Sequence, residues 1–214
     1  DMLNRLTMNF KQYKNYSYSE YFQPEIENSD PTSKKIDKSK YNLLIINRRI
    51  GENDDYICQS IRDNDLNEFK SILNRENLNF NAKIVPSIFE TNPFLIKNSP
   101  SLIEYAAFHG SNDIFLFLIN KVNQLSPSIW LYAIHGRKIN IIKNLENLKI
   151  KPEDGTFEKC LKESIKCHHN EIAEYIMSHL INQENESIHK KIVEFAFHYH
   201  NYIYFPSNFN NDSI

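Results

Sequence analysis

The chain has 214 residues, a formal net charge of -2 and 41% hydrophobic residues, which is enough for one sizeable domain or one repeat array. Because Lys and Arg only balance Asp and Glu, the composition lacks the dense cationic surface of duplex-binding proteins, and we expect no nucleic-acid partner. With only 4 Gly and 8 Pro the chain is poor in turn formers, which argues against an all-β sandwich.

The cysteines and the apolar runs bear on the compartment. Cys58, Cys160 and Cys167 are odd in number and imply no disulfide framework, so reduced thiols in the cytosol are the simplest interpretation. No secretory signal opens the chain, and its longest purely apolar runs, such as Ile114 to Ile119, fall far short of the roughly 20 residues that span a bilayer. We therefore expect a cytoplasmic protein without membrane insertion. The chain does not begin with Met, which leaves open that it is a segment of a longer protein.

Residues 1–50 differ from the rest and are predicted to form an extended or partly helical N-terminal arm and linker. A polar stretch at 28–35 contains an Asp-Pro step that is typical of a turn. Tyr41 to Ile50 are predicted to form a short helix that ends at Gly51. The arm also carries a cluster of aromatic residues: Tyr13, Tyr16, Tyr18, Tyr21 and Phe22.

From residue 51 to residue 205 the chain repeats one pattern, which is clearest between Ser101 and Leu118. Counted from Leu102, small residues stand at plus 4 and plus 5 (Ala106 and Ala107), a turn residue at plus 8 (Gly110), and large apolar residues at plus 13 and plus 16 (Phe115 and Leu118). This pattern predicts two short helices joined by a tight turn. Each helix is too short to be stable alone, and each pair of helices buries its apolar face by stacking on neighbouring pairs.

The same pattern recurs from Tyr56, Ile129 and Cys160 and, more weakly, from Ile192. The plus 4 residues of the five copies are Ser60, Ala106, Ala133, Ser164 and Ala196. The copies predict units at about 55–80, 100–125, 127–150, 157–181 and 187–205, followed by a tail at 206–214.

The run Leu102-Ile103-Glu104-Tyr105-Ala106-Ala107-Phe108-His109-Gly110 resembles the ankyrin signature leucine-x-x-x-alanine-alanine-x-x-glycine. The segments 130–136 and 165–173 resemble a divergent ankyrin group that is expanded in some parasitic protists and is known only as a domain of unknown function. This resemblance covers about residues 50–180 well and 187–205 weakly. It implies an all-α, ankyrin-like helical repeat solenoid of about four to five units, preceded by an irregular N-terminal extension.

The chain departs from the ankyrin pattern in three respects. The Thr-Pro-Leu-His opening is missing, and the glycine at plus 8 survives only in the second unit, as Gly110. An insertion from Asn74 to Ser99 separates the first two units and is interpreted as either a long finger or a degenerate unit.

Metal binding is the sharpest alternative to a purely structural interpretation. Six potential ligands fall in the C-terminal third: Cys160, Cys167, His168, His169, His198 and His200. However, no C-x-x-C or H-x-x-x-H motif is present, and the histidines recur because the turn between the helices recurs. We therefore predict no metal site and no cofactor, and keep a zinc-binding protein or enzyme as a second alternative.

Other chemistry finds less support. No G-x-S-x-G elbow or Gly-rich phosphate loop exists, and the neighbours Cys167 and His168 would point about 100° apart on a helix. The short basic groups at 34–40 and 48–49 are typical of a charged linker, with nuclear import or nucleic-acid binding as the alternative. The chain is thus predicted not to be an enzyme.

The ankyrin resemblance implies that a partner protein binds the concave face, formed by the first helix of each unit. The candidate residues follow the plus 4 and plus 5 pair in each unit: Arg62 and Asp63, Phe108 and His109, His135 beside Gly136, Lys166 and Cys167, and His198 and Tyr199. The set is mixed in charge and partly aromatic, which favours a protein partner over DNA. The predicted function is a non-catalytic interaction module or scaffold.

Two questions about aromatic residues stay open at this stage. Trp130 and Tyr132 suit either an interface or packing on the next unit. The Tyr-rich arm would be costly to leave exposed, which suggests as an alternative function a structural component of a cytoskeletal or ciliary (microtubule) assembly, with a cytoskeletal location.

Overall fold

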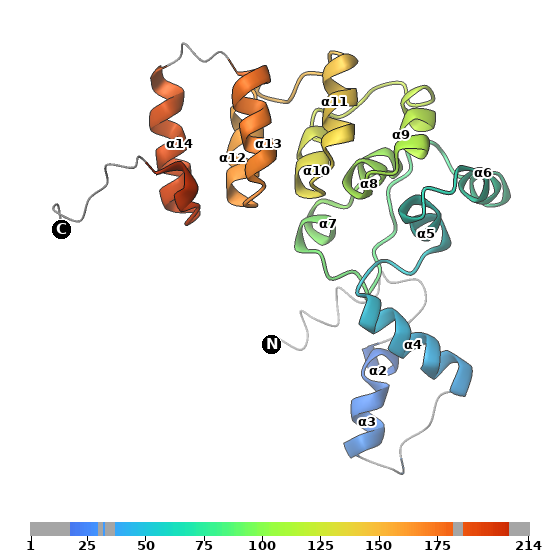
Figure 1. The fold of residues 1–214 in the computed structure, drawn as a ribbon. Helices are drawn as coiled ribbons and strands as arrows, with labels where there is room; N and C mark the ends of the chain where they lie inside the picture. Colours follow the sequence, from blue (N-terminus) through green and yellow to red (C-terminus); the bar gives the residue numbers. More distant parts are fainter. Residues whose placement is uncertain (1–17, 30–31, 33–36, 182–185, 206–214) are drawn as a thin grey trace. The chain divides into compact units, whose positions relative to one another are not determined.

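The computed structural model describes residues 18–29, 32, 37–181 and 186–205, in which helices are connected by turns and loops and no strand is formed (Figure 1). Within them, one isolated antiparallel bridge joins Lys83 and Ser101. The predicted all-α class is confirmed. The chain divides into two compact units, residues 1–102 and residues 103–214, which are described separately below.

Some of the predicted features fall outside the described residues. They are Tyr13 and Tyr16 of the arm, the Asp-Pro step at 30–31, Lys34 and Lys35 of the basic group, and the tail at 206–214. Among the helices that are described, none is both long enough and apolar enough to cross a bilayer.

The first unit contains six described helices: three in the N-terminal arm, two in the first helix pair and one in the insertion. Their bounds are α2 Tyr18–Tyr21, α3 Gln23–Ser29, α4 Lys38–Ile50, α5 Tyr56–Arg62, α6 Leu66–Arg75 and α7 Pro93–Asn98. The short helix expected at 41–50 is confirmed as α4. Asp37 caps its N-terminus by accepting hydrogen bonds from the backbone N–H groups of Ser39 and Lys40, and Gly51 ends it with φ 71°.

The described part of the aromatic arm packs inside the first unit. Leu44 on α4 is fully buried against Phe89, and Tyr21 and Ile88 complete this small apolar cluster. The rings of Tyr21 and Phe89 lie 5.7 Å apart, and the guanidinium of Arg48 lies 4.9 Å from the Tyr21 centroid. Because Tyr21 packs within its own unit, its ring does not need a filament partner to cover it. This residue therefore gives no support to the cytoskeletal alternative.

The insertion after α6 is a packed loop with a single helix, α7. The backbone of Ile84 donates to the Pro100 carbonyl at 2.7 Å, and that of Leu102 donates to the Ala82 carbonyl at 3.0 Å. Phe89 and Leu95 are buried. The insertion is therefore held to its own unit by backbone pairing and apolar contacts, and it contains no second helix that would pair with α7.

The second unit consists of successive helix pairs. Their bounds are α8 Leu102–His109, α9 Asn112–Ile119, α10 Ile129–His135, α11 Ile139–Asn147, α12 Glu158–Lys166, α13 Asn170–Tyr175, the π-helix η1 Ile176–Leu180, α14 Glu186–His198 and the 3₁₀ helix η2 Tyr202–Tyr204. Helix α10 packs against α11 and α12, and α12 packs against α13 and α14, so that these helices stand side by side in chain order (Figure 1).

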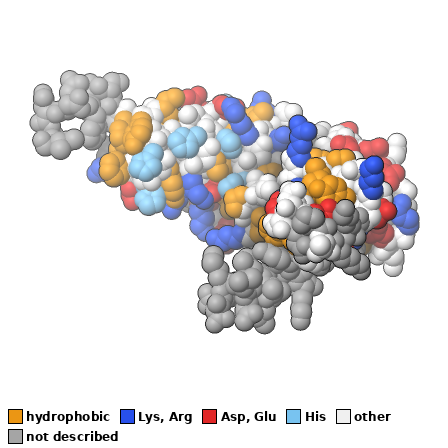
Figure 2. Space-filling view, turned by 90° about the horizontal axis from the view of Figure 1, so that it is seen from below, with side chains coloured by type: hydrophobic (Ala, Val, Ile, Leu, Met, Phe, Trp, Pro, Cys, Tyr) orange, Lys and Arg blue, Asp and Glu red, His pale blue; other side chains and the backbone are white. Residues whose placement is uncertain are grey.

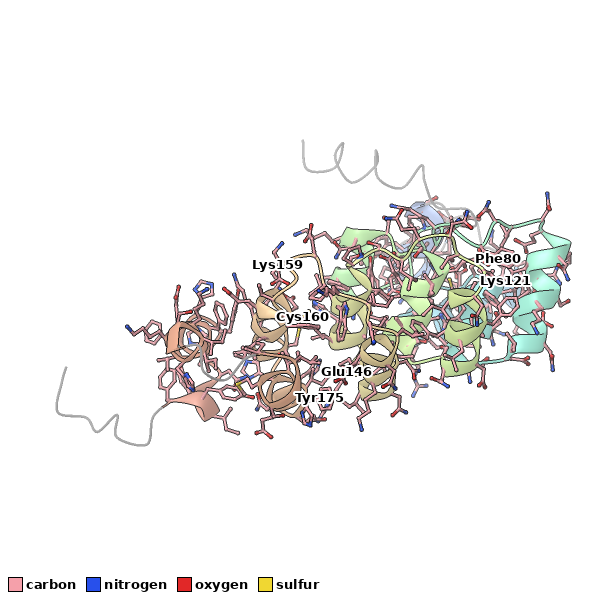
Figure 3. The ribbon with its side chains drawn as sticks, turned by 90° about the horizontal axis from the view of Figure 1, so that it is seen from above. Phe80, Lys121, Glu146, Lys159, Cys160 and Tyr175 are labelled. Carbon is pink, nitrogen blue, oxygen red and sulfur yellow. The ribbon has the colours of Figure 1, made fainter. Side chains whose placement is uncertain are left out.

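Polar contacts link the second helices of successive pairs. The Asn144 side chain on α11 donates to the Asn112 side chain on α9 at 2.8 Å. Glu146 and Tyr175 point toward each other from α11 and α13, and the Tyr175 hydroxyl donates to the Glu146 carboxylate (Figure 3). Cys160, on α12, is buried and helps to fill the interior of the stack.

The five copies of the sequence pattern share one backbone turn. Their plus 8 residues all adopt positive φ: Asn64 at 52°, Gly110 at 75°, and Arg137, His168 and His200 at 56°, 57° and 57°. In each copy the backbone N–H at plus 9 donates to the carbonyl at plus 4: Asp65 to Ser60, Ser111 to Ala106, Lys138 to Ala133, His169 to Ser164 and Asn201 to Ala196. This is the left-handed helix end that glycine favours, and the chain keeps it without glycine in four copies.

Because a left-handed backbone costs a non-glycine residue roughly 1 kcal/mol, His168→Gly is expected to raise the free energy of unfolding by up to about 1 kcal/mol. Urea unfolding followed by circular dichroism measures this change. Lys162→Gly, at an exposed position within α12, is the control and should lower stability by about 1 kcal/mol. His168→Gly also removes the exposed contact of the imidazole with the Tyr199 carbonyl, so only a loss of stability above about 1.5 kcal/mol would contradict the turn conformation.

Candidate functional site

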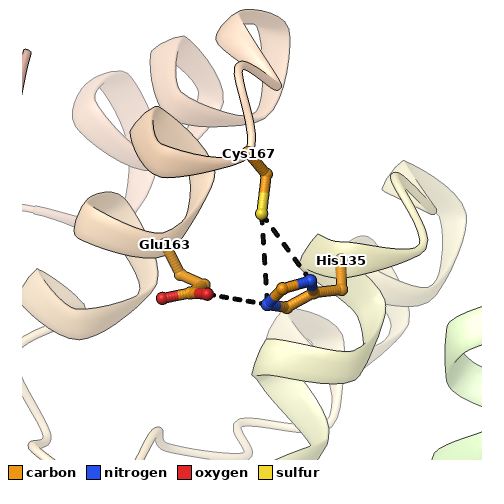
Figure 4. Close-up of side chains that lie close together, drawn as sticks. All are labelled: His135, Glu163 and Cys167. Atoms are coloured by element: carbon orange, nitrogen blue, oxygen red, sulfur yellow. Dashed lines mark hydrogen bonds and ion pairs between the residues drawn. The ribbon is translucent and has the colours of Figure 1, made fainter. Parts of the chain in front are cut away.

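The structure brings His135, Glu163 and Cys167 together in the second unit (Figure 4). His135 is the last residue of α10, Glu163 lies on α12, and Cys167 caps the C-terminus of α12. The His135 Nε2 lies 2.7 Å from the Glu163 Oε1, and the Cys167 Sγ lies 3.7 Å from Nδ1 and 4.0 Å from Nε2 of the same ring. We call these three residues the His–Glu–Cys cluster.

The repeat explains why these residues meet. Counted from the start of each copy, His135 stands at plus 6, and Cys167 stands at plus 7 of the next copy. The preceding pair of copies shows the same register, because Gly136 at plus 7 lies directly against the backbone of Phe108 at plus 6. Side-by-side packing of the first helices thus places the end of one beside the end of the next.

The Glu163 carboxylate is ionised at neutral pH although it is largely buried. Burial raises its pKa, but hydrogen bonds from His135 and from Lys166, at 2.7 Å each, and the charges of both partners outweigh burial and bring the pKa down to about 2. Only 17% of the Glu163 side chain and 15% of the His135 side chain are exposed, so solvent screens the pair weakly.

The pKa shift of Glu163 predicts a pH-dependent contribution to stability. Its folded pKa lies below the ordinary value of 4.5, so the contribution is complete above about pH 4.5 and is lost as the pH falls toward 2. Glu163→Gln should lower stability at pH 7, by up to about 3 kcal/mol, and flatten the loss between pH 4.5 and pH 2. Urea unfolding at several pH values measures both effects.

Glu171→Gln is the matched control for this prediction. Glu171 pairs with Arg137 at 2.7 Å, but both side chains are more than half exposed, and exposed ion pairs contribute little. An acid profile of Glu163→Gln that is as steep as that of the unmodified protein would contradict the assignment.

The His–Glu–Cys cluster does not have the geometry of an activated nucleophile. The Cys167 sulfur is nearly equidistant from both ring nitrogens and so does not lie in line with one lone pair. Burial, together with the negative charge of Glu163, raises the pKa of the Cys167 thiol to about 11, which keeps it protonated at neutral pH. The cluster therefore links the end of α10 to α12 and contains no activated thiol, and its three donor atoms are of types that also bind metal ions.

The six potential zinc ligands named from the sequence do not gather. His168 Nε2 contacts the Tyr199 carbonyl at 3.2 Å, and His200 Nδ1 contacts the Tyr202 hydroxyl at 3.0 Å. Cys160 is buried in the stack, and burial raises its pKa to about 12. Of the six, only Cys167 belongs to a group of three metal-ligating side chains within the part of the chain that the structure describes.

Most of the predicted partner-binding residues lie at the helix ends of the second unit. Phe108 and His109 stack edge to face at 5.1 Å, and His198 and Tyr199 do so at 4.6 Å. His135, Lys166 and Cys167 meet around Glu163. Figure 2 shows histidine side chains gathered on the face that carries these turns, at the α12–α14 end of the unit.

Arg62 and Asp63 lie in the first unit, where they line a groove of about 640 Å³. Arg62 is held in place by an ion pair to Glu52 at 2.8 Å and a hydrogen bond to the Asn53 carbonyl at 2.8 Å. Asp63 is exposed. The opposite wall of the groove is formed by α4.

The α4 wall of this groove is an exposed apolar stripe. Leu43, Ile46 and Ile50 stand three and four residues apart, so they share one face of the helix, and about half of each residue is exposed (51%, 53% and 54%). Tyr56, at the start of α5, adds a ring that is 71% exposed. Sequence reasoning assigned 41–50 to a helix but did not separate its buried face, at Leu44, from this exposed one.

Trp130 does not belong to a surface site. It is fully buried, its indole N–H donates to the Ile150 carbonyl at 3.0 Å, and its ring meets Phe157 edge to face at 5.0 Å. The packing interpretation of Trp130 is therefore confirmed, and the interface interpretation is wrong. Tyr132 is also buried.

Comparison of the chain with protein-family profiles, with curated proteins and with solved structures gives no match.

Proposed function

We propose that this chain is a non-catalytic protein-interaction module, built as an ankyrin-like helical repeat array, and that its partner docks an amphipathic helix in the α4–α5 groove. The observation that carries the proposal is the stripe of Leu43, Ile46 and Ile50. Three aliphatic side chains that are each half exposed on one helix face cost free energy in water, and such patches mark interaction surfaces.

The shape and charges of the groove define the partner. An exposed stripe with spacing i, i+3 and i+7 is complementary to a second helix with apolar residues at the same spacing. The groove is lined by acidic Glu52, Asp54 and Asp63 and by two basic residues, which are paired: Arg62 with Glu52, and Lys40 with Glu20. A basic residue of the partner is therefore expected beside Asp63, where it would favour one orientation of the bound helix.

The test is selection of ligands from a library of helical peptides on the immobilised full chain. Enriched peptides should carry the i, i+3 or i+4, i+7 apolar pattern, and Ile46→Glu should weaken their binding by about tenfold or more. Leu116→Glu is the matched control, because Leu116 is an aliphatic residue of α9 that is 39% exposed and lies outside the groove. Peptides that bind Ile46→Glu as tightly as the unmodified chain would contradict the proposal.

A second copy of the chain could cover the stripe in place of the proposed partner helix. If sedimentation shows a dimer that Ile46→Glu dissociates, the groove is covered by a second copy, and the proposed partner helix is wrong.

The row of helix ends in the second unit is a second candidate surface. None of Phe108, His135 and Tyr199 is fully buried, and neighbouring copies bring such residues together. Changing Phe108 and His109 together to glutamate should abolish binding of a partner that uses this row. The same variant should leave peptides of the α4–α5 groove unaffected.

A further inference from the structure

We propose that His135, Glu163 and Cys167 bind one Zn²⁺ ion that joins the ends of α10 and α12. This inference does not rest on the proposed function, and it assigns a site to residues that the sequence patterns did not group.

The donor atoms have the right identity for zinc. Imidazole nitrogen, carboxylate oxygen and thiolate sulfur are the three ligand types of protein zinc sites. A thiolate disfavours Mg²⁺ and Ca²⁺, which take oxygen ligands, and favours the softer transition metals. Three protein ligands with a fourth position for water form the open type of zinc site.

The distances are close to those of a zinc site. With Zn–S bonds of about 2.3 Å and Zn–N bonds of about 2.0–2.1 Å, ligand atoms around a tetrahedral ion lie roughly 3.3–3.6 Å apart. Glu163 faces the His135 Nε2, and the Cys167 Sγ lies 4.0 Å from that same nitrogen, so binding through Nε2 requires the sulfur to approach by roughly 0.5 Å. One ligand atom from each of the three residues fits within 4.8 Å of the others. The Nε2–Oε1 distance of 2.7 Å must open by roughly 0.6 Å, which rotation of a carboxylate provides.

The surroundings allow an ion to enter. Cys167 is half-buried, and 46% of the Lys166 side chain is exposed. Lys166 donates to the same Glu163 oxygen that faces His135, so it must turn into solvent when the ion binds. Binding requires loss of the Cys167 thiol proton and of any proton on the His135 nitrogen that coordinates the ion.

The test uses the purified full chain after treatment with a chelator. Titration with Zn²⁺ in competition with a chromophoric chelator should give one equivalent bound, with release of at least one proton per ion. Co²⁺ is the spectroscopic probe and should produce tetrahedral ligand-field bands and a thiolate-to-cobalt charge-transfer band. Cys167→Ser should abolish the charge-transfer band and weaken Zn²⁺ binding by about tenfold or more.

The controls separate this site from other histidines and from loss of folding. His189→Ala, on an exposed face of α14, should leave Zn²⁺ affinity unchanged, whereas His135→Ala should weaken it. Alkylation of Cys167 in the unmodified protein should slow on addition of Zn²⁺, which needs no variant. Less than about one tenth of an equivalent bound, or equal affinity in Cys167→Ser, would overturn the proposal.

Discussion

Trp130→Ala is expected to lower the free energy of unfolding by about 3–5 kcal/mol. The indole is fully buried, so its removal leaves a cavity next to Phe157. It also leaves the Ile150 carbonyl without the N–H that now donates to it at 3.0 Å. Ile150 follows α11, so the loss should loosen the α10–α11 pair as a whole.

Trp130→Phe separates the two contributions to this effect. It keeps an aromatic contact with Phe157 but cannot donate to Ile150, and it should cost about 1–3 kcal/mol. Because Trp130 is the only tryptophan, urea unfolding is followed by circular dichroism and not by tryptophan fluorescence. If Trp130→Ala unfolds at the same urea concentration as the unmodified chain, the indole does not hold the pair together.

The sequence predicts the helix pairs well because local chemistry determines them. Small residues at plus 4, such as Ala106, Ala133 and Ser164, are fully buried as expected, and large residues at plus 13, such as Phe115 and Ile142, are buried too. The helix end at Gly51 follows directly from glycine. The left-handed turn at Arg137 could not be predicted from that residue alone, because arginine does not favour that conformation.

The His–Glu–Cys cluster was missed because it depends on register between copies. His135 and Cys167 were both predicted to bind a partner protein, but the sequence pattern did not predict that their side chains contact each other. Glu163 was not selected at all, since it stands at plus 3, before the small residues that marked the candidate positions. Alignment of the copies could have predicted this contact. If the first helices of successive copies pack side by side, the end of α10 lies beside α12.

The stripe on α4 was missed for a different reason. Residues 42–50 contain aliphatic side chains on more than one face, so periodicity predicts a helix without saying which face is buried. The insertion decides which face is buried, because Phe89 packs on Leu44 and leaves Leu43, Ile46 and Ile50, on a different face of the helix, exposed. Contacts between residues that are distant in sequence therefore determine both which residues form the His–Glu–Cys cluster and which face of α4 is exposed.

Gly136→Ala is expected to destabilise the second unit by about 3 kcal/mol, although Gly136 has an ordinary backbone conformation with φ -75°. The reason is close approach. A methyl group at this position would lie 1.8 Å from the Phe108 carbonyl oxygen and 2.7 Å from its carbon. Both are backbone atoms, which cannot rotate away, so the ends of α8 and α10 must separate.

Gly155→Ala is the matched control for the close approach at Gly136. Gly155 has φ 65°, and no atom lies within 4 Å of the added methyl group, so only backbone strain of about 1 kcal/mol is expected. The difference between the two variants in urea unfolding, about 2 kcal/mol, measures the contact of α10 with Phe108. The same register places His135 beside Cys167 one copy later, so Gly136→Ala should also weaken Zn²⁺ binding. Equal stabilities of the two variants would show that α8 and α10 do not approach in this register.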